Sequence, residues 1–566
     1  MSDNFLIQKM FENRGYDDSF LRDINQSHHD ILKDSDKLCE TLHQIKMQNL
    51  HIVCYPDFDT DGIMSGVVSF AGLSELGFSV SLFLPDPNEG YGFKPESLKR
   101  LLHEYPDADV ILTSDVGITS GTAIAMAKQC GLMVLVTDHH KQIGSLPVAD
   151  VVVDPMRVDE TYSHPYICGS YVIYQVLEQY ACKYGTPFQK SQIRRLRVFA
   201  GIGTISDTML LYYENRQLVK DAILICRLLY SNQTDFVIQH LTGCEIYRRA
   251  FYGLWMMLKI YADSGVIDDA SDIDEIFFGY YLAPAFNSVK RMGESMSKAF
   301  GVFFGGQVEE DANYLYMLNN QRKELVRTSL IELQSVDQPY APYVYLSSAP
   351  SGILGLLAQD IIKQTGVPTI VVNCDDMIHG SGRSPMWYPC LTRMNQAGFS
   401  GAGHDPAFGV WFADEAQIVE FCNFVQQDLS SVLATIDESV IESKPDFVIA
   451  LDNSGDIGID ILMFLEYLSE LDDLKPFGAG FPSPSILLKF HPKDGEWKQM
   501  GSTKQHLKIL LQYGFEVVLF NQGALFDLKD SDEECFVVGY LQMNEFRGVQ
   551  SVNFIGTMEL KGDDNS

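Results

Sequence analysis

The sequence predicts an α/β protein whose N-terminal half is built around a parallel sheet. Apolar segments of strand length recur between residues 50 and 153, and segments with helical patterning, such as 63–76 and 121–130, lie between them. This alternation is typical of βαβ units. Each apolar segment is followed by an aspartate, either directly or after one residue. The acids therefore fall at the sheet edge where open α/β folds bind their ligands.

The first predicted strand, 50–55, is followed by Asp57, Asp59 and Asp61 in the run Asp-Phe-Asp-Thr-Asp-Gly. Three carboxylates so close together repel one another, and burial increases the cost, so the run indicates a bound cation. Alternate residues share one face of a strand, although a loop at the strand end could also direct them to one point.

The next strands lead into further polar groups. Segment 110–113 precedes Asp115, segment 132–137 precedes Asp138, His139 and His140, and segment 150–153 precedes Asp154. Each aspartate could instead cap the helix that follows it. That alternative explains one residue better than the whole set with its two histidines, so we expect these side chains to converge on one crevice.

The remaining elements follow in order. Residues 1–45 look polar and helical, and 310–335 form one long amphipathic pattern that would connect two halves of a cleft. From about 340 the pattern alternates again between strand and helix, and from about 445 it becomes rich in strands.

Several motifs carry a resemblance to a known family. The D-x-D-x-D-G, S-D-x-G and D-H-H elements, followed by Gly203-Thr-Ile-Ser-Asp207, resemble the DHH phosphoesterases in this order. Later segments narrow this to a resemblance to RecJ-type exonucleases, which are specific for single-stranded DNA. These segments are 284–293, 380–384, 401–409 and 476–484.

Three positions depart from the pattern of that family. Ala402 interrupts the usual G-G-H, Phe481 stands where asparagine is usual, and Lys290 replaces a glycine. The departures leave the acid and histidine set untouched and concern the path of the substrate strand.

The resemblance implies a fold and roles for individual residues. It implies a DHH catalytic domain at 46–265 after an N-terminal arm at 1–45, a helical connector at 266–339, a DHHA1-like domain at 340–444 and an OB-like β-barrel at 445–566. Asp59, Asp61, Asp115, His139 and Asp207 would bind metal, with Asp115 as the bridge. Asp57 would bind metal or accept a hydrogen bond from a metal ligand, and Asp138 would orient an imidazole. His140 would contact the phosphate or the leaving oxygen, and the alternative for His140 is a buried histidine bonded to backbone. The residues that would bind phosphate or DNA are Arg291, Ser381, Arg383, Ser384, Gly403 and His404.

The ligand types point to the metal. Oxygen ligands with one or two imidazoles favour two divalent ions, Mn²⁺ or Mg²⁺, over zinc. In the C-terminal region Trp497, Tyr513, Phe515 and Phe520 lie among lysines and could stack on bases, although ordinary core packing is the simpler interpretation of each.

Composition sets the broad class. The chain has 566 residues, of which 46% are hydrophobic and 21% charged, as in globular proteins. With 42 basic and 75 acidic residues its net charge is −33, which is unusual for a nucleic-acid binder. We therefore expect a basic channel on an acidic body. The sequence shows no membrane span or secretory signal, and its cysteines lack a C-x-x-C pair, so we expect a cytoplasmic location.

The predicted function is metal-dependent 5′-to-3′ digestion of single-stranded DNA to mononucleotides, in recombination or repair. We expect a monomer that acts on single-stranded DNA, does not bind membranes, and has a single-strand-binding protein or a helicase as candidate partner. One alternative is a phosphodiesterase of short oligonucleotides or cyclic dinucleotides, and another is an inactive scaffold of a replication complex.

Overall fold

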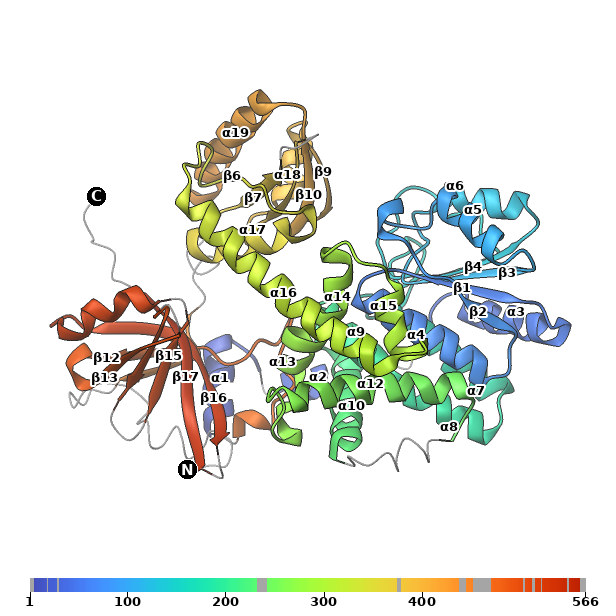
Figure 1. Ribbon diagram of the computed structural model, residues 1–566, viewed down its shortest axis with the longest axis horizontal. Helices are drawn as coiled ribbons and strands as arrows, with labels where there is room; N and C mark the ends of the chain where they lie inside the picture. Colours follow the sequence, from blue (N-terminus) through green and yellow to red (C-terminus); the bar gives the residue numbers. More distant parts are fainter. Residues whose placement is uncertain are drawn as a thin grey trace. The chain divides into compact units, whose positions relative to one another are not determined.

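The computed structural model describes residues 5–17, 19–27, 30–231, 242–373, 378–436, 444–450, 470–501, 504–511, 515–520, 522–546 and 549–559. The chain forms two compact units (Figure 1). The larger unit is Gln26–Asp437, and the smaller one combines Met1–Asn25 with Glu438–Ser566.

The first sheet of the larger unit contains five parallel strands in the order β2-β1-β3-β4-β5, which confirms the predicted α/β fold. The strands are β1 (Ile52–Pro56), β2 (Val80–Leu82), β3 (Val110–Ser114), β4 (Met133–Thr137) and β5 (Val151–Val153). Strand β2 was not predicted, because its three half-buried residues form no apolar run that stands out in the sequence.

Side chains of β1 alternate between two cores, one on each face of the sheet. Ile52 and Cys54 pack into one core, and Val53 and Tyr55 pack into the other. Figure 1 shows α5 and α6 on one side of the sheet and α3 and α4 on the other. These helices are α3 (Ser35–Gln48), α4 (Thr60–Glu75), α5 (Pro95–Glu104) and α6 (Gly121–Gln129). Both faces are thus covered, as a parallel sheet requires.

A helical layer follows the sheet and ends in a long helix. Its members are α7 (Gly169–Tyr184), α8 (Pro187–Arg195), α9 (Arg197–Ser206), α10 (Tyr213–Ser231), α12 (Glu245–Asp263), α13 (Glu275–Phe277), α14 (Ala283–Arg291), α15 (Ser297–Phe304) and α16 (Val308–Ser335). A π-helical turn, Phe278–Leu282, joins α13 to α14. Helix α16 confirms the predicted long connecting helix, and three acids in its first turn suit the positive end of its dipole.

The second sheet has the order β6-β7-β8-β10-β9 and is mixed, which confirms a second α/β domain. Its strands are β6 (Val344–Leu346), β7 (Thr369–Asn373), β8 (Ile378–Arg383), β9 (Ser400–His404) and β10 (Ala407–Phe412). Its helices are α17 (Ser351–Thr365), α18 (Cys390–Gln396) and α19 (Glu415–Leu433).

The smaller unit contains a seven-stranded sheet of order β11-β12-β16-β17-β15-β14-β13. Its strands are β11 (Phe447–Ala450), β12 (Ile486–Phe490), β13 (Glu496–Met500), β14 (His506–Leu510), β15 (Glu516–Leu519), β16 (Cys535–Phe546) and β17 (Val549–Glu559). Of the aromatic residues considered for base stacking, Phe515 is buried, Trp497 donates its indole N–H to the carbonyl of Pro492, and Phe520 is 54% exposed. Tyr513 lies outside the described residues.

The N-terminal helices α1 (Phe5–Arg14) and α2 (Phe20–Ile24) belong to this smaller unit. Arg14 donates from Nε and Nη2 to the two carboxylate oxygens of Asp446, at 2.7 and 2.8 Å. The ring of Phe20 packs against Phe481, the residue that replaces the expected asparagine. The segment 1–45, which we expected to be one arm, is thus divided between the two units.

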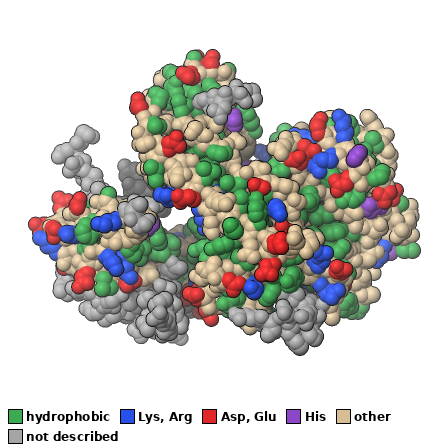
Figure 2. Space-filling model, viewed as in Figure 1, with side chains coloured by type: hydrophobic (Ala, Val, Ile, Leu, Met, Phe, Trp, Pro, Cys, Tyr) green, Lys and Arg blue, Asp and Glu red, His purple; other side chains and the backbone are tan. Residues whose placement is uncertain are grey.

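Charge and hydrophobicity at the surface give two further observations. On the face drawn in Figure 2, basic and acidic side chains are interspersed over the described residues. Within those residues, no helix is both long enough and apolar enough to cross a membrane.

Candidate metal centre and phosphate pocket

The carboxyl ends of three neighbouring strands bring the predicted acids together. Pro56 is in register with Ser114, and Ser114 with Thr137, so the residue after each strand end is an aspartate. Asp57, Asp115 and Asp138 continue the sheet by one step, since their N–H groups donate to Ser114, Thr137 and Val153 at 3.3, 2.9 and 3.1 Å. The sheet itself therefore sets the spacing of these aspartates.

The other two acids of the first motif are placed by helix α4. Asp59 is its N-cap and accepts a hydrogen bond from the N–H of Gly62 at 3.0 Å, so this residue caps a helix and also belongs to a possible ligand set. Asp61 lies in the first turn, 1% exposed, and accepts hydrogen bonds from the N–H groups of Gly169 and Ser170 and from the Ser170 hydroxyl. The loop and the helix end, rather than one strand face, aim these side chains.

Two glycines allow this close approach. A Cβ atom at Gly169 would lie 2.3 Å from Asp115 Oδ1, and one at Gly203 would lie 2.2 Å from Asp61 Oδ1. Both positions thus require the smallest residue. Gly203 belongs to the motif Gly203-Thr-Ile-Ser-Asp207, whereas Gly169 and the Ser170 donor were missed, because no pattern around them in the sequence sets them apart.

His139 lies at the centre of the cluster. Its Nε2 atom is 3.1 Å from Asp115 Oδ1, 3.5 Å from Asp207 Oδ2 and 3.9 Å from Asp61 Oδ2. Burial and the neighbouring His140 lower the pKa of His139, which favours the neutral ring that binds metals.

Three sets of side chains bring ligand atoms within 4.8 Å of one another. The sets are Asp115–His139–His140, Asp61–His139–Asp207 and Asp57–Asp59–Asp115. Asp115 belongs to two of them, as a bridging ligand would. The donors are hard oxygens and imidazole nitrogens, which suit Mn²⁺ or Mg²⁺.

The electrostatics of the cluster also indicate a cation. Burial raises the pKa of Asp57, Asp115 and Asp207 well above the usual value, and neighbouring carboxylates raise it further. Asp115 Oδ1 is buried and accepts no hydrogen bond among the described residues, although Nε2 of His139 lies 3.1 Å from it. An orphaned buried oxygen beside repelling carboxylates is costly unless an ion binds there. The residues present therefore fit a divalent metal centre.

Behind this cluster, Asp138 orients His140. The carboxylate of Asp138 accepts from the N–H of Ile118 at 2.8 Å and from Nδ1 of His140 at 2.8 Å. Burial acts to raise the pKa of Asp138, but the hydrogen bond and charge of His140 lower it overall. Burial likewise acts to lower the pKa of His140, but the bond and charge of Asp138 raise it to about 10. Asp138 thus favours the charged form of His140, and the ring is held by a carboxylate rather than by backbone.

Tyr91 also contacts the His140 ring and was not predicted. Its hydroxyl oxygen lies 3.2 Å from Nδ1 and 2.9 Å from Nε2 of His140, and its ring packs edge-to-face on Phe58. The sequence Gly90-Tyr91-Gly92 was the available signal, because an aromatic residue between glycines in a loop beside a predicted sheet edge is unusual.

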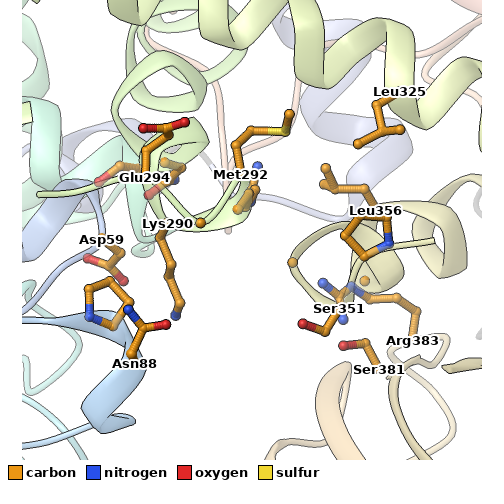
Figure 3. Close-up of a pocket in the computed structure, with 18 residues that line it drawn as sticks. Asp59, Asn88, Lys290, Met292, Glu294, Leu325, Ser351, Leu356, Ser381 and Arg383 are labelled. Carbon is orange, nitrogen blue, oxygen red and sulfur yellow. The ribbon is translucent and has the colours of Figure 1, made fainter. Parts of the chain in front are cut away.

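A pocket of about 760 Å³ opens beside the acids (Figure 3). Asp59 and Lys290 line one part of it, and Arg291, Ser381 and Arg383 also contribute to its wall. Ser381 and Arg383 are alternate residues of β8 and share a face. The glycines beside them lie against neighbouring groups. A Cβ atom at Gly382 would lie 2.4 Å from the Phe408 ring, and one at Gly380 would lie 2.4 Å from the Val371 carbonyl oxygen.

The basic side chains of the pocket repel one another. Burial and the nearby Arg322 and Arg383 lower the pKa of Arg291 to about 10. Arg322 donates to Asn319 Oδ1, and Arg383 donates to the carbonyl of Gly382. In the part of the chain that the structure describes, none of these three guanidinium groups has an ion-pair partner. Such a cluster fits an anion with several oxygens, such as phosphate.

Three residues that we expected to bind phosphate do not line this pocket. Ser384 is buried and donates its hydroxyl to the carbonyl of Tyr388 at 2.7 Å. Gly403 and His404 lie at the end of the edge strand β9, where they pair with Phe408 and Ala407. The G-S-G-R motif thus contributes Ser381 and Arg383 to the pocket, while Ser384 stabilises the neighbouring turn.

Comparisons with known proteins agree with this architecture. Residues 51–200 match the DHH family (N-terminal domain), and residues 462–556 match the RecJ OB domain. The chain is 25% identical over 568 residues to the single-stranded-DNA-specific exonuclease RecJ of Bacillus subtilis, covering 96% of this chain and 66% of that protein. It is 26% identical to RecJ of Thermus thermophilus, covering 92% of this chain and 71% of the relative.

Solved structures show the same fold. The crystal structure of RecJ with Mn²⁺ from Thermus thermophilus matches with a TM-score of 0.71 at 22% identity, covering 98% of this chain and 76% of that one. The Mg²⁺ complex of the same protein matches with a TM-score of 0.67. With matches to the DHH family and to the RecJ OB domain, and with relatives that align along nearly its whole length, the chain is similar to the RecJ-type members of the DHH family.

Proposed function

We propose that the protein is a metal-dependent exonuclease that degrades single-stranded DNA. The observation that carries the proposal is a pocket lined both by Asp59, a member of the acid–histidine cluster that is short of positive charge, and by Arg291 and Arg383, which have no ion-pair partner among the described residues. A phosphodiester with a terminal phosphate satisfies both halves. The names of the RecJ relatives, which specify single-stranded DNA, support the choice of substrate.

Asp57, Asp59, Asp61, Asp115, His139 and Asp207 would hold two divalent ions, with Asp115 shared between them. Such ions, when bound, lower the pKa of water and neutralise charge on the phosphate under attack. Hydrolysis then consumes one water molecule for each phosphodiester and frees one nucleotide.

The protein's own side chains would position the substrate. Arg383 and Arg291 offer charged N–H donors and Ser381 offers a hydroxyl for a terminal phosphate. The hydrogen bond and charge of Asp138 raise the pKa of His140, which favours the protonated ring that would donate to a phosphate oxygen or to the leaving oxygen. Asp138 and Tyr91 fix its ring, which reduces the reorganisation needed for that donation.

A phosphate pocket next to the acids would also set the polarity and the product. If the terminal phosphate of the strand occupies the Arg383 pocket, the first internucleotide bond lies toward the acid cluster. Release of 5′-mononucleotides in the 5′-to-3′ direction, and a role in recombination or repair, are parts of this proposal. The match to the RecJ OB domain favours long strands over cyclic dinucleotides as substrate.

The test is digestion of a 5′-phosphorylated single strand that carries a label at either end, with Mn²⁺ and with a duplex as control. Early release of the 5′ label as a mononucleotide, with the duplex spared, is the expected result. Cleavage of dinucleotides alone would replace the proposal with the small-substrate alternative. Absence of turnover with Mn²⁺ and with Mg²⁺ would favour the scaffold.

A further inference from the structure

Lys290 places a cation on the acidic side of the pocket. It lies near the C-terminal end of α14 and lines the pocket together with Asp59. Figure 3 shows Lys290 and Asp59 on one side of the pocket, across from Ser351, Ser381 and Arg383. Neither the family resemblance nor the predicted site includes this lysine, because it stands where the family has glycine.

The ammonium group is held by an aromatic ring. Nζ of Lys290 lies 3.9 Å from the centroid of the Phe58 ring. Phe58 is 4% exposed and sits between Asp57 and Asp59, so the same loop carries the carboxylates and anchors the cation. A cation–π contact fixes the position of the ammonium but leaves its N–H donors available for oxygen acceptors.

Lys290 has no ion-pair partner among the residues that the structure describes, although Asp57 and Asp59 lie close enough to favour its charged form. Burial lowers the pKa of Lys290, and these two carboxylates oppose that effect. A divalent ion held by Asp57 and Asp59 would repel the ammonium group. An anion bound between the divalent ion and the ammonium group would offset this repulsion.

Lys290 and Arg291 serve different sides of the same pocket. Successive residues of an α-helix point about 100° apart, because one turn contains about 3.6 residues. Arg291 is close enough to Arg322 and Arg383 to be repelled by both, whereas Lys290 is attracted by Asp57 and Asp59. Helix α14 thus presents one cation to the guanidinium cluster and another to the acid cluster.

We infer that Lys290 is a second phosphate contact, which binds a non-bridging oxygen of the first internucleotide phosphate while Arg291 and Arg383 bind the terminal phosphate. The inference rests on the proposed function and adds a residue that determines how the strand lies. The ligand is the anionic oxygen of a phosphodiester, so the contact is independent of base sequence.

The test is equilibrium binding of a 5′-phosphorylated oligothymidine strand in EDTA, where hydrolysis does not interfere. Lys290→Met keeps an unbranched side chain of similar length beside Phe58 and removes the charge, and Lys290→Arg restores the charge. Lys183→Met is the matched control, because Lys183 also lies over a ring, that of Tyr184, but does not line the pocket. Circular dichroism and the melting temperature establish that each variant is folded.

We expect Lys290→Met to make the slope of log affinity against log salt concentration less negative by about 0.7, the value for one phosphate contact on a single strand. Lys290→Arg should restore the slope, and Lys183→Met should leave it unchanged. A strand with an uncharged methylphosphonate at its first linkage should bind the wild-type protein as weakly as the ordinary strand binds Lys290→Met. It should bind the variant with no further loss.

An unchanged salt slope in Lys290→Met, with the full methylphosphonate penalty retained, would overturn this inference and leave the proposed function standing. An effect of Lys290→Met only on the concentration of Mn²⁺ needed for hydrolysis would also overturn it, since the lysine would then act on the carboxylates alone. Failure of the wild-type protein both to bind and to hydrolyse the strand would overturn the proposed function and this inference together.

Discussion

The acid cluster at the edge of the first sheet and the paired charges of Arg14 and Asp446 show two opposite uses of buried charge. Asp446 receives two hydrogen bonds from Arg14 and another from the N–H of Ser485, so its charge is fully matched. Asp57, Asp115 and Asp207 repel one another, and their pKa values are raised. Paired opposite charges stabilise the structure, whereas a cluster of like charges is unfavourable until a ligand of opposite charge binds.

The guanidinium cluster repeats the second pattern with the opposite sign. Arg291, Arg322 and Arg383 gather without counter-ions among the described residues, and the pKa of Arg291 falls to about 10. One region therefore requires cations and the other requires anions, and a single pocket includes residues of both. The following predictions test this difference, from the largest expected effect to the smallest.

Asp115→Asn should lower hydrolysis of single-stranded DNA by about 10³-fold or more, because it removes the carboxylate that two ligand sets share. The same substitution should raise the melting temperature in EDTA, since it relieves repulsion within the cluster. Asp107→Asn is the control, because Asp107 lies outside the cluster with its side chain 76% exposed. Loss of activity with a lowered melting temperature would indicate misfolding instead.

Metal should stabilise the fold most at high pH. An acid whose pKa is raised in the folded state binds its proton more tightly there, so folding stability falls as pH rises through that range. Burial raises the pKa of Asp154 to about 8, so the folding stability that its protonated form contributes is lost between about pH 4 and 8. The pKa of His140 is raised to about 10, so the folding stability that its charged form contributes is lost above about pH 6.5.

In EDTA the melting temperature should therefore fall from pH 5 to pH 8. At pH 8, Mn²⁺ at a hundredfold excess over its dissociation constant should restore about 2.7 kcal/mol. Scanning calorimetry with and without Mn²⁺ measures both effects. A melting temperature that does not change when Mn²⁺ is added would argue against a metal centre.

Arg383→Ala should weaken recognition of a 5′-terminal phosphate by about 2 kcal/mol, roughly 30-fold, because it removes charged donors to that group. KM for a phosphorylated strand should rise while that for a strand with a 5′-hydroxyl changes little. Arg383→Lys keeps the charge but not the two-pronged geometry and should recover only part of the effect. Equal losses on both strands would place Arg383 away from the terminal phosphate.

Arg14→Ala should have the smallest effect, a loss of about 1 kcal/mol in the stability of the smaller unit, because Ser485 still donates to Asp446. Hydrolysis of short oligonucleotides should not change. Urea unfolding followed by the fluorescence of Trp497, which lies in this unit, measures the loss. Reduced cleavage of a dinucleotide by a folded Arg14→Ala would contradict the assignment of this pair to structure alone.

The sequence by itself determined the parallel sheet and much of the metal centre. Apolar runs of strand length that lead to Asp57, Asp115 and Asp138 suffice to predict that these aspartates lie together, because the carboxyl ends of parallel strands share one edge of a sheet. Local order along the chain thus fixes which carboxylates meet. The long helix α16 was equally predictable from its amphipathic pattern.

Only the tertiary structure decided the second wall of the pocket and the partners of the site. Ser384 adjoins Arg383 in the sequence yet turns into the fold, and Lys290 and Tyr91 reach the acids from helices and loops far along the chain. Packing between distant segments sets these contacts, and no local periodicity encodes them. The same holds for the N-terminal helices, whose place beside Asp446 depends on a pair of charges more than 400 residues apart in the chain.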